Sequence, residues 1–292
     1  MATLRLLQQH LPPLAFDIVK LANGLILLAV LLIPLERLFA LRPQKVFRHG
    51  FFTDIGYYFV TSLLPARVLV LPLTALALAV QHFAPSAPRL WVSAWPFWLR
   101  IAASLLIAEL GFYWGHRWMH SNPWLWRFHA IHHGPAGMDW LVNTHAHPVD
   151  LIITRLCGYI PLYLLGLAQI APGRIDWIPL LVALVGSLWG YFIHANLRWR
   201  YGWLEHVIAT PAFHHWHHDN VAPGIAHKNY SPLFPLVDRI FGTLQPTGSG
   251  WPRAYGIREP GEDGMAGQLI QPFLPVATVA AATRSPDKIT AP

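Results

Sequence analysis

Long apolar runs alternate with short polar segments along this chain of 292 residues. Five runs, at about 18–41, 55–82, 97–115, 151–171 and 177–195, each approach the ~20 residues that a helix needs to cross the hydrocarbon core of a bilayer. Prolines interrupt these runs, which membrane helices tolerate where the freed backbone groups find other partners. The second run is long and contains Arg67, so it could combine a span with a re-entrant or interfacial piece. The pattern predicts an all-α integral membrane protein with about four to five transmembrane helices.

The composition and charge agree with a membrane protein. The mean hydropathy is +0.37 and only 12% of the residues are charged, about half the fraction found in soluble proteins. The net charge of +7 is not arranged as a basic run interleaved with aromatic residues, so nucleic-acid binding is not expected. Instead, the basic residues flank the apolar runs, as the cytoplasmic ends of membrane helices do; they are Arg37, Arg42, Lys45, Arg48, Arg198 and Arg200.

The basic flank at 37–48 sets a predicted topology. It places the end of the first run in the cytoplasm, so the second run exits and the third returns near Gly115. The last two runs then form a hairpin with an outer turn from Pro172 to Asp176. This topology brings residues 116–150 and 214–218 to the cytoplasmic face, in the inner membrane if the protein is bacterial. No cleavable signal peptide is evident, and the lone Cys157 is expected to be a small apolar residue in a buried helix.

Three histidine clusters fall in these cytoplasmic segments. Residues three or four apart share one face of a helix, so each cluster can direct its rings at a common point. Neutral imidazole is a common ligand of first-row metals, and eight imidazoles exceed what one ion takes. The sequence therefore predicts a site for two metals. The clusters are HRWMH (His116, His120), HAIHH (His129, His132, His133) and HHWHH (His214, His217, His218).

Other metal sites fit the sequence less well. A zinc metalloprotease needs HExxH, but residue 117 is Arg. A ferritin-like di-iron site needs Glu-x-x-His pairs, and neither Glu109 nor Glu205 has a histidine three residues on. A metal transporter or a non-catalytic metal-binding membrane protein is the alternative, although a transporter favours ligands near the bilayer midplane. A histidine-dominated site with non-haem iron fits best, since iron accepts imidazole and activates oxygen.

Taken in order, the histidine segments resemble those of the fatty acid hydroxylase / sterol desaturase superfamily, the membrane-bound histidine-box oxygenases. The motifs are HRWMH, NPWLWRFHAIHH, HAHPVD, HAN, TPAFHHWHH and KNYSPLFPLVDRIFGTL, and the resemblance covers about residues 50–245. It implies transmembrane helices beneath a cytosolic helical cap that carries two metals. It also implies an O2-dependent enzyme that hydroxylates or desaturates a lipid. We accordingly expect an N-terminal span and basic flank over 1–48, a fatty acid hydroxylase / sterol desaturase-like domain over 49–245, and an irregular tail over 246–292.

The same resemblance implies the ligands and partners. Two iron ions are expected, with zinc possible in a purified sample. A lipid from the bilayer would be the substrate. Electrons would come from a ferredoxin or from cytochrome b5 with its reductase, since the chain resembles no fused cytochrome b5. The implied metal ligands are His116, His120, His129, His132, His133, His147, His194, His214, His217 and His218.

Several positions near these motifs stay open. Many members have Asp where this chain has Glu109, and Arg where it has His145. Either His145, His215 or His227 could join the metal site, although His215 is expected to support or pack against the ligands. Asn196 and Asp238 are expected to hold imidazole N–H groups or to cap helices.

Overall fold

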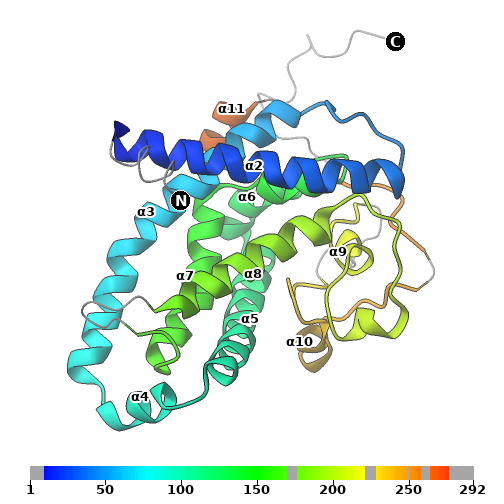
Figure 1. Cartoon of the computed structure of the whole chain (residues 1–292). Coiled ribbons are helices and arrows are strands. Elements are labelled where there is room, and N and C mark those ends of the chain that lie inside the picture. The colour runs from blue at the N-terminus through cyan, green and yellow to red at the C-terminus, as the bar shows by residue number, and fades with distance from the viewer. Residues whose placement is uncertain (1–9, 170–175, 221–227, 249, 258–263, 276–292) are drawn as a thin grey trace.

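The computed structural model describes residues 10–169, 176–220, 228–248, 250–257 and 264–275 (Figure 1). The described residues form helices joined by loops, with two isolated β-bridges, so the all-α prediction is confirmed. The elements are α2 (Pro13–Leu38), α3 (Phe51–Phe83), α4 (Ser86–Ser93), α5 (Phe97–Ser121), α6 (Pro123–His132), η1 (Trp140–Thr144), α7 (Pro148–Leu164), α8 (Trp177–His194), η2 (Gly202–His206), α9 (Pro211–His217), α10 (Pro235–Ile240), α11 (Met265–Ile270) and η3 (Gln271–Phe273).

Four of these helices, α2, α3, α5 and α8, are long and apolar enough to cross a membrane. The chain is therefore a multi-pass membrane protein. The long second run forms one continuous helix, and its Arg67 pairs with Asp17 on α2 at 2.9 Å. The run predicted at 151–171 forms α7, which has 17 residues. At about 1.5 Å per residue, α7 measures roughly 26 Å and is short of the ~30 Å hydrocarbon core.

The helix α7 packs closely against α5, and glycines make this possible. A Cβ atom placed on Gly111 of α5 would lie 2.1 Å from the carbonyl oxygen of Cys157 on α7. A Cβ atom on Gly158 would lie 2.4 Å from the ring of Phe112. Small residues allow membrane helices to approach to backbone contact. Cys157 is half-buried at this crossing, where it packs as the small residue that the sequence predicts.

Chain direction gathers the histidine segments at one end of the molecule. The helix α3 runs toward α4 and α5 runs back, while α7 and α8 repeat this path (Figure 1). The carboxyl ends of α5 and α8 therefore lie at the end opposite α4, beside α6 and α9. The outer turn predicted from Pro172 lies outside the described residues up to 175. Asp176, at its end, caps α8 by accepting a hydrogen bond from the backbone N–H of Ile178 at 3.0 Å.

Local signals start the short helices that carry histidines. Proline occupies the first turn of α6 and of α9, where its missing N–H costs nothing. Asn122 caps α6 by accepting hydrogen bonds from two backbone N–H groups, and Thr210 caps α9 by accepting one from the backbone N–H of Phe213. In the tail, α11 and η3 fold back onto the molecule, and Phe273 packs against Phe128 of α6.

Candidate metal centre

Nine of the ten histidines predicted as ligands meet in two neighbouring sets. Within each set, the nitrogen atoms that could bind a metal all lie within 4.8 Å of one another. The two sets are adjacent, because the rings of His133 and His218 stack across them with centroids 4.3 Å apart. The first set contains His116, His120, His129, His133 and His217, and the second contains His132, His194, His214 and His218.

Hydrogen bonds fix the tautomer of several rings. In the first set, His116 Nδ1 lies 2.7 Å from the carbonyl oxygen of Tyr230, and His217 Nδ1 lies 2.8 Å from that of Lys228. In the second set, His194 Nδ1 lies 2.7 Å from the carbonyl oxygen of Gly190. A carbonyl oxygen can only accept, so each of these Nδ1 atoms carries the proton and Nε2 presents a lone pair.

The Nε2 atoms nevertheless face one another at short range. In the first set, His116 Nε2 lies 3.1 Å from His129 Nε2, and the Nδ1 of His129 lies 2.8 Å from the carboxylate of Asp150. In the second set, His194 Nε2 lies 3.2 Å from His132 Nε2. Two lone pairs directed at each other repel unless a cation lies between them. The donor arrangement therefore fits a metal ion in each set, all ligand atoms being imidazole nitrogens.

Burial keeps these imidazoles neutral, as metal binding requires. Removal from water lowers the pKa of His132, His133, His214, His217 and His218 well below the usual 6.5, and the neighbouring imidazoles lower it further. The group therefore stays unprotonated at neutral pH, with its lone pairs available.

The tenth predicted ligand, His147, lies outside both sets. It is the N-cap of α7, and its Nδ1 accepts a hydrogen bond from the backbone N–H of Val149 at 3.1 Å. Its Nε2 donates to the carbonyl oxygen of Leu269 in α11 at 3.1 Å. Because both ring nitrogens are engaged by the backbone, His147 joins the tail to the start of α7 and offers no free lone pair.

The histidines left open by the sequence have other roles. His145 Nδ1 pairs with Asp54 at 2.5 Å, while its backbone carbonyl accepts from His132 Nδ1 at 3.1 Å. The buried His215 lies between the hydroxyl of Tyr255, at 2.8 Å from its Nδ1, and the carbonyl of Ala195, at 3.2 Å from its Nε2. Both therefore support the ligand-bearing segments, and neither belongs to the two sets. His227 lies outside the described residues.

Asn196 and Asp238 act through the backbone. The Asn196 side chain exchanges two hydrogen bonds with the backbone of Arg42. Asp238 accepts from the backbone N–H of Tyr230 at 2.9 Å, and the carbonyl of Tyr230 is the group that holds His116. Neither touches a ligand imidazole through its side chain. Glu109 holds the same loop from α5 by accepting from the N–H groups of residues 233 and 234.

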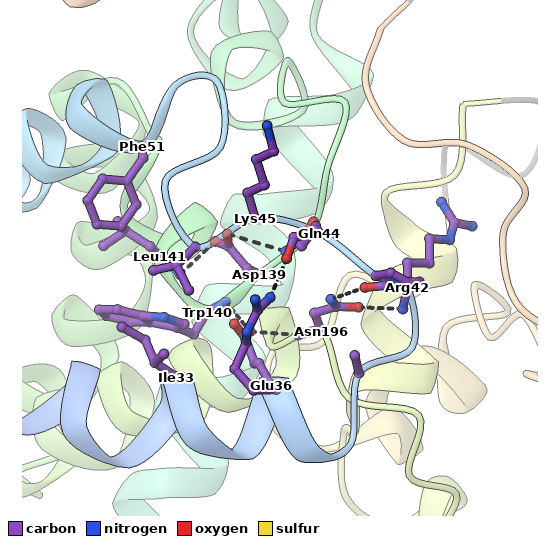
Figure 2. A pocket seen from close by; sticks show the side chains of 14 residues that line it. Ile33, Glu36, Arg42, Gln44, Lys45, Phe51, Asp139, Trp140, Leu141 and Asn196 are labelled. Carbon is purple, nitrogen blue, oxygen red and sulfur yellow. Dashed lines mark hydrogen bonds between the residues drawn. The ribbon is translucent and has the colours of Figure 1, made fainter.

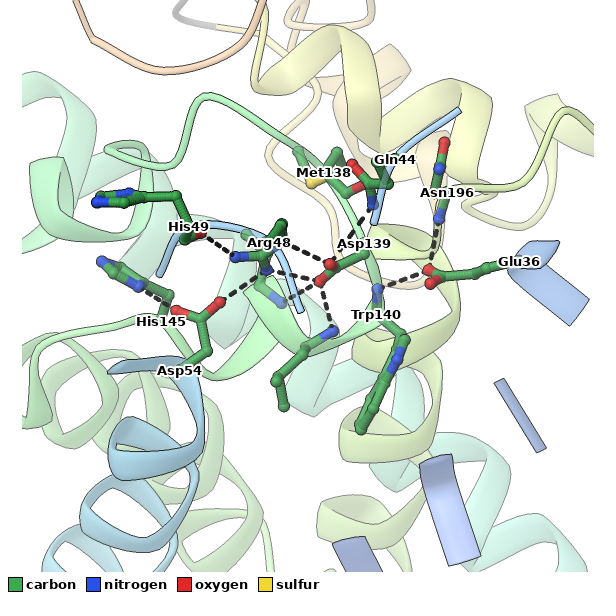
Figure 3. Close-up of polar contacts among 12 residues, drawn as sticks. Glu36, Gln44, Arg48, His49, Asp54, Met138, Asp139, Trp140, His145 and Asn196 are labelled. Carbon is green, nitrogen blue, oxygen red and sulfur yellow. Dashed lines mark hydrogen bonds and ion pairs between the residues drawn. The ribbon is translucent and has the colours of Figure 1, made fainter. Parts of the chain in front are cut away.

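A polar network that the sequence pattern did not single out supports the second set. Arg48, from the loop before α3, donates to Asp139 at 2.6 and 2.7 Å and to Asp54 at 2.7 Å (Figure 3). Asp54 in turn holds His145, whose backbone holds His132. Asp54 lies six residues from Arg48, but His145 is 91 positions from Asp54 and Asp139 is 91 positions from Arg48, so local spacing could not reveal the network.

Comparisons with known proteins relate the chain to lipid hydroxylases and monooxygenases. The sequence model of fatty acid hydroxylase matches residues 101–243. The chain is 33% identical over 268 residues to the ornithine lipid hydroxylase of Rhizobium tropici, which covers 88% of this chain and 75% of that protein. It is 31% identical over 170 residues to the alkylglycerol monooxygenase of Danio rerio, covering 58% of this chain and 34% of that protein. It is 28% identical over 177 residues to methylsterol monooxygenase 2-2 of Arabidopsis thaliana, covering 57% and 60%. No solved structure matches the chain.

Proposed function

The chain belongs to the fatty acid hydroxylase family, and we propose that it hydroxylates a polar membrane lipid at a pair of iron ions held by the two histidine sets. Membership makes it an O2-dependent lipid oxidoreductase and argues against the metal-transporter alternative. The observation that carries the proposal is the convergence of imidazole lone pairs in two buried groups. Hydroxylation is favoured over desaturation because the compared relatives are named hydroxylases or monooxygenases.

Iron is the proposed metal for both sets. Imidazole suits zinc, copper, nickel and iron alike, but zinc has no redox chemistry and an oxygenase needs a metal that activates O2. When bound, iron would activate O2 for the oxidation of an unreactive C–H bond. We propose nine ligands and leave out His147, whose nitrogens are engaged elsewhere.

The residues of the chain position these ligands and exclude water. Backbone carbonyls hold the Nδ1 protons of four ligands, and Asp150 holds that of His129. Such outer partners keep a ligand in one orientation and raise its basicity. Eight of the nine ligand histidines are buried, so bulk water is kept from the centre and does not compete for the reactive species.

We propose that the substrate arrives from the bilayer and electrons from the cytoplasm. The positive-inside rule supports a cytoplasmic position for the centre, because the basic loop 39–50 packs beside it. That basic face would steer an acidic donor such as a ferredoxin or cytochrome b5. Residues 49–245 would then form the catalytic domain, with 1–48 as an additional span and basic flank.

One experiment tests the two-set proposal. His120→Ala removes a ligand from the first set and His214→Ala removes one from the second, while His206→Ala changes an exposed histidine as a control. We expect each ligand variant to lose iron and to abolish the +16 mass shift in the lipids of expressing cells. The control should retain both. If His214→Ala kept two irons per chain and full turnover, the second set would not be a metal site.

A further inference from the structure

A cavity of about 480 Å³ lies beside the carboxyl end of α2 (Figure 2). Its walls come from the last turns of α2 and the loop that follows, from residues 139–141 at the start of η1, and from Asn196 just after α8. Its volume falls in the range of about 300–1,000 Å³ that small-molecule sites occupy. No histidine lines it, so the proposed metal chemistry does not account for it.

Hydrogen bonds between distant segments hold the cavity open. Glu36 Oε1 accepts from the backbone N–H groups of Trp140 and Asn196, each at 2.8 Å (Figure 3). The amide of Gln44 donates to the carbonyl oxygen of Met138 at 3.1 Å. The walls are therefore tied together before any ligand arrives, as in most small-molecule sites.

The second carboxylate oxygen of Glu36 faces this space. Glu36 is 9% exposed, and within the described part of the chain its Oε2 takes part in no hydrogen bond or ion pair. That oxygen is nevertheless not enclosed by protein atoms, so it is accessible from the cavity that Glu36 lines. The other acidic lining residue, Asp139, is already paired with Arg48. A nearly buried carboxylate without a cationic partner is costly, and an ammonium group would supply that partner.

Cations stand at the edge of the same cavity. Arg37 and Lys45 line it and are exposed, and Lys45 extends away from Glu36 (Figure 2). A guanidinium has five N–H groups. Within the described residues, Arg37 forms one hydrogen bond, to the carbonyl oxygen of Gln44, so it has further N–H groups that could bind a ligand. The cavity thus offers a carboxyl oxygen inside and positive groups at its edge.

We propose that this cavity binds the headgroup of a zwitterionic aminolipid. The ammonium group of the lipid would pair with Glu36, and its carboxylate or phosphate would pair with Arg37 and Lys45. A membrane lipid is the expected source because the cavity lies at the end of an apolar span, where headgroups lie. The inference rests on the proposed function and names the substrate class for it.

The cavity also lies close to the second histidine set. Asn196 in its wall follows the ligand His194 by two residues, which span at most about 7 Å of backbone. On another wall, η1 leads to His145, whose carbonyl oxygen accepts from His132. A lipid held here by its headgroup would therefore place a carbon close to that headgroup near the second histidine set, and this carbon would be the one that reacts.

Matched lipids and variants test the assignment. Iron-loaded enzyme in nanodiscs with a reductase chain would receive ornithine lipid or phosphatidylethanolamine, each beside its N-acetylated counterpart, which lacks the ammonium group. We expect the wild type to prefer the free amine by about tenfold or more in kcat/KM, the effect typical of a charged hydrogen bond. Glu36→Gln keeps the Oε1 acceptor, so the variant should still fold. Its preference for the free amine should disappear, mainly because KM for the free aminolipid rises.

Two further variants separate charge from folding. Asp17→Asn makes the same charge change near the other end of α2, on a side chain that is 34% exposed, and should leave the preference intact. Lys45→Gln changes an exposed side chain and should raise KM for both free aminolipids. Equal turnover of the free and acetylated lipids by the wild type, or an unaltered preference in folded Glu36→Gln, would overturn the headgroup assignment. Turnover of no lipid by the metal-loaded enzyme would instead refute the proposed function.

Discussion

Asp150→Asn isolates the contribution of one outer partner to the metal centre. The carboxylate of Asp150 lies 2.8 Å from His129 Nδ1, and both side chains are 4% exposed. Because the carboxylate only accepts, it keeps the proton on Nδ1 and the lone pair on Nε2, which faces the first histidine set. An asparagine can turn its NH2 group toward the ring and favour the other tautomer, which directs an N–H at the metal position.

Removing such a partner typically costs 10- to 100-fold in metal affinity or activity. The corresponding free-energy loss is about 1.5–3 kcal/mol, which is also the range for a hydrogen bond to a charged group. We therefore expect competition with a chelator to show iron binding to the first set weakened by that factor. The control is Asp176→Asn, which alters a cap at the opposite end of the molecule and should reduce stability without changing metal affinity. Wild-type iron affinity in folded Asp150→Asn would refute the assigned role of this contact.

Two further predictions concern stability. The pKa values of His132, His133, His214, His217 and His218 are lowered in the folded state, so the unfolded chain takes up protons first. In metal-free protein this stabilisation should be complete above about pH 6.5 and fall on acidification, by up to about 1.4 kcal/mol per group and pH unit; a thermal midpoint unchanged from pH 7.5 to 5.5 would contradict it. Gly111→Ala should lower the free energy of unfolding by about 1–3 kcal/mol through overpacking, and so lower the thermal midpoint. Gly186→Ala, where a Cβ meets nothing within 4 Å, should be neutral or stabilising.

The long apolar runs and the spacing of the histidines predicted much of the fold. Apolar runs of about 20 residues identified the four spans, because the bilayer imposes a minimum length on any helix that crosses it. The fourth run, at 151–171, is too short to be a span because Leu164 ends α7 after 17 residues. Hydropathy cannot register where a helix stops when the following residues remain apolar. The clustering of nine histidines was likewise predictable, since both their spacing and the direction of the spans point them to one end.

The supporting contacts were not predictable, and His147 shows why. In sequence it precedes a proline in a histidine-rich segment, which is also how a ligand would look. In the structure its position as the N-cap of α7 commits Nδ1 to a backbone N–H, and α11 takes up Nε2 from 122 residues away. Glu36 is the converse case, because hydropathy treats it as one charge at the end of a span. The role proposed for Glu36 depends on two backbone N–H groups, one from η1 and one from Asn196 just after α8. They donate to one carboxylate oxygen and leave the other for the proposed ligand. Residue type and spacing therefore locate the chemistry in this chain, but the partners of each polar atom decide which residues are free to perform it.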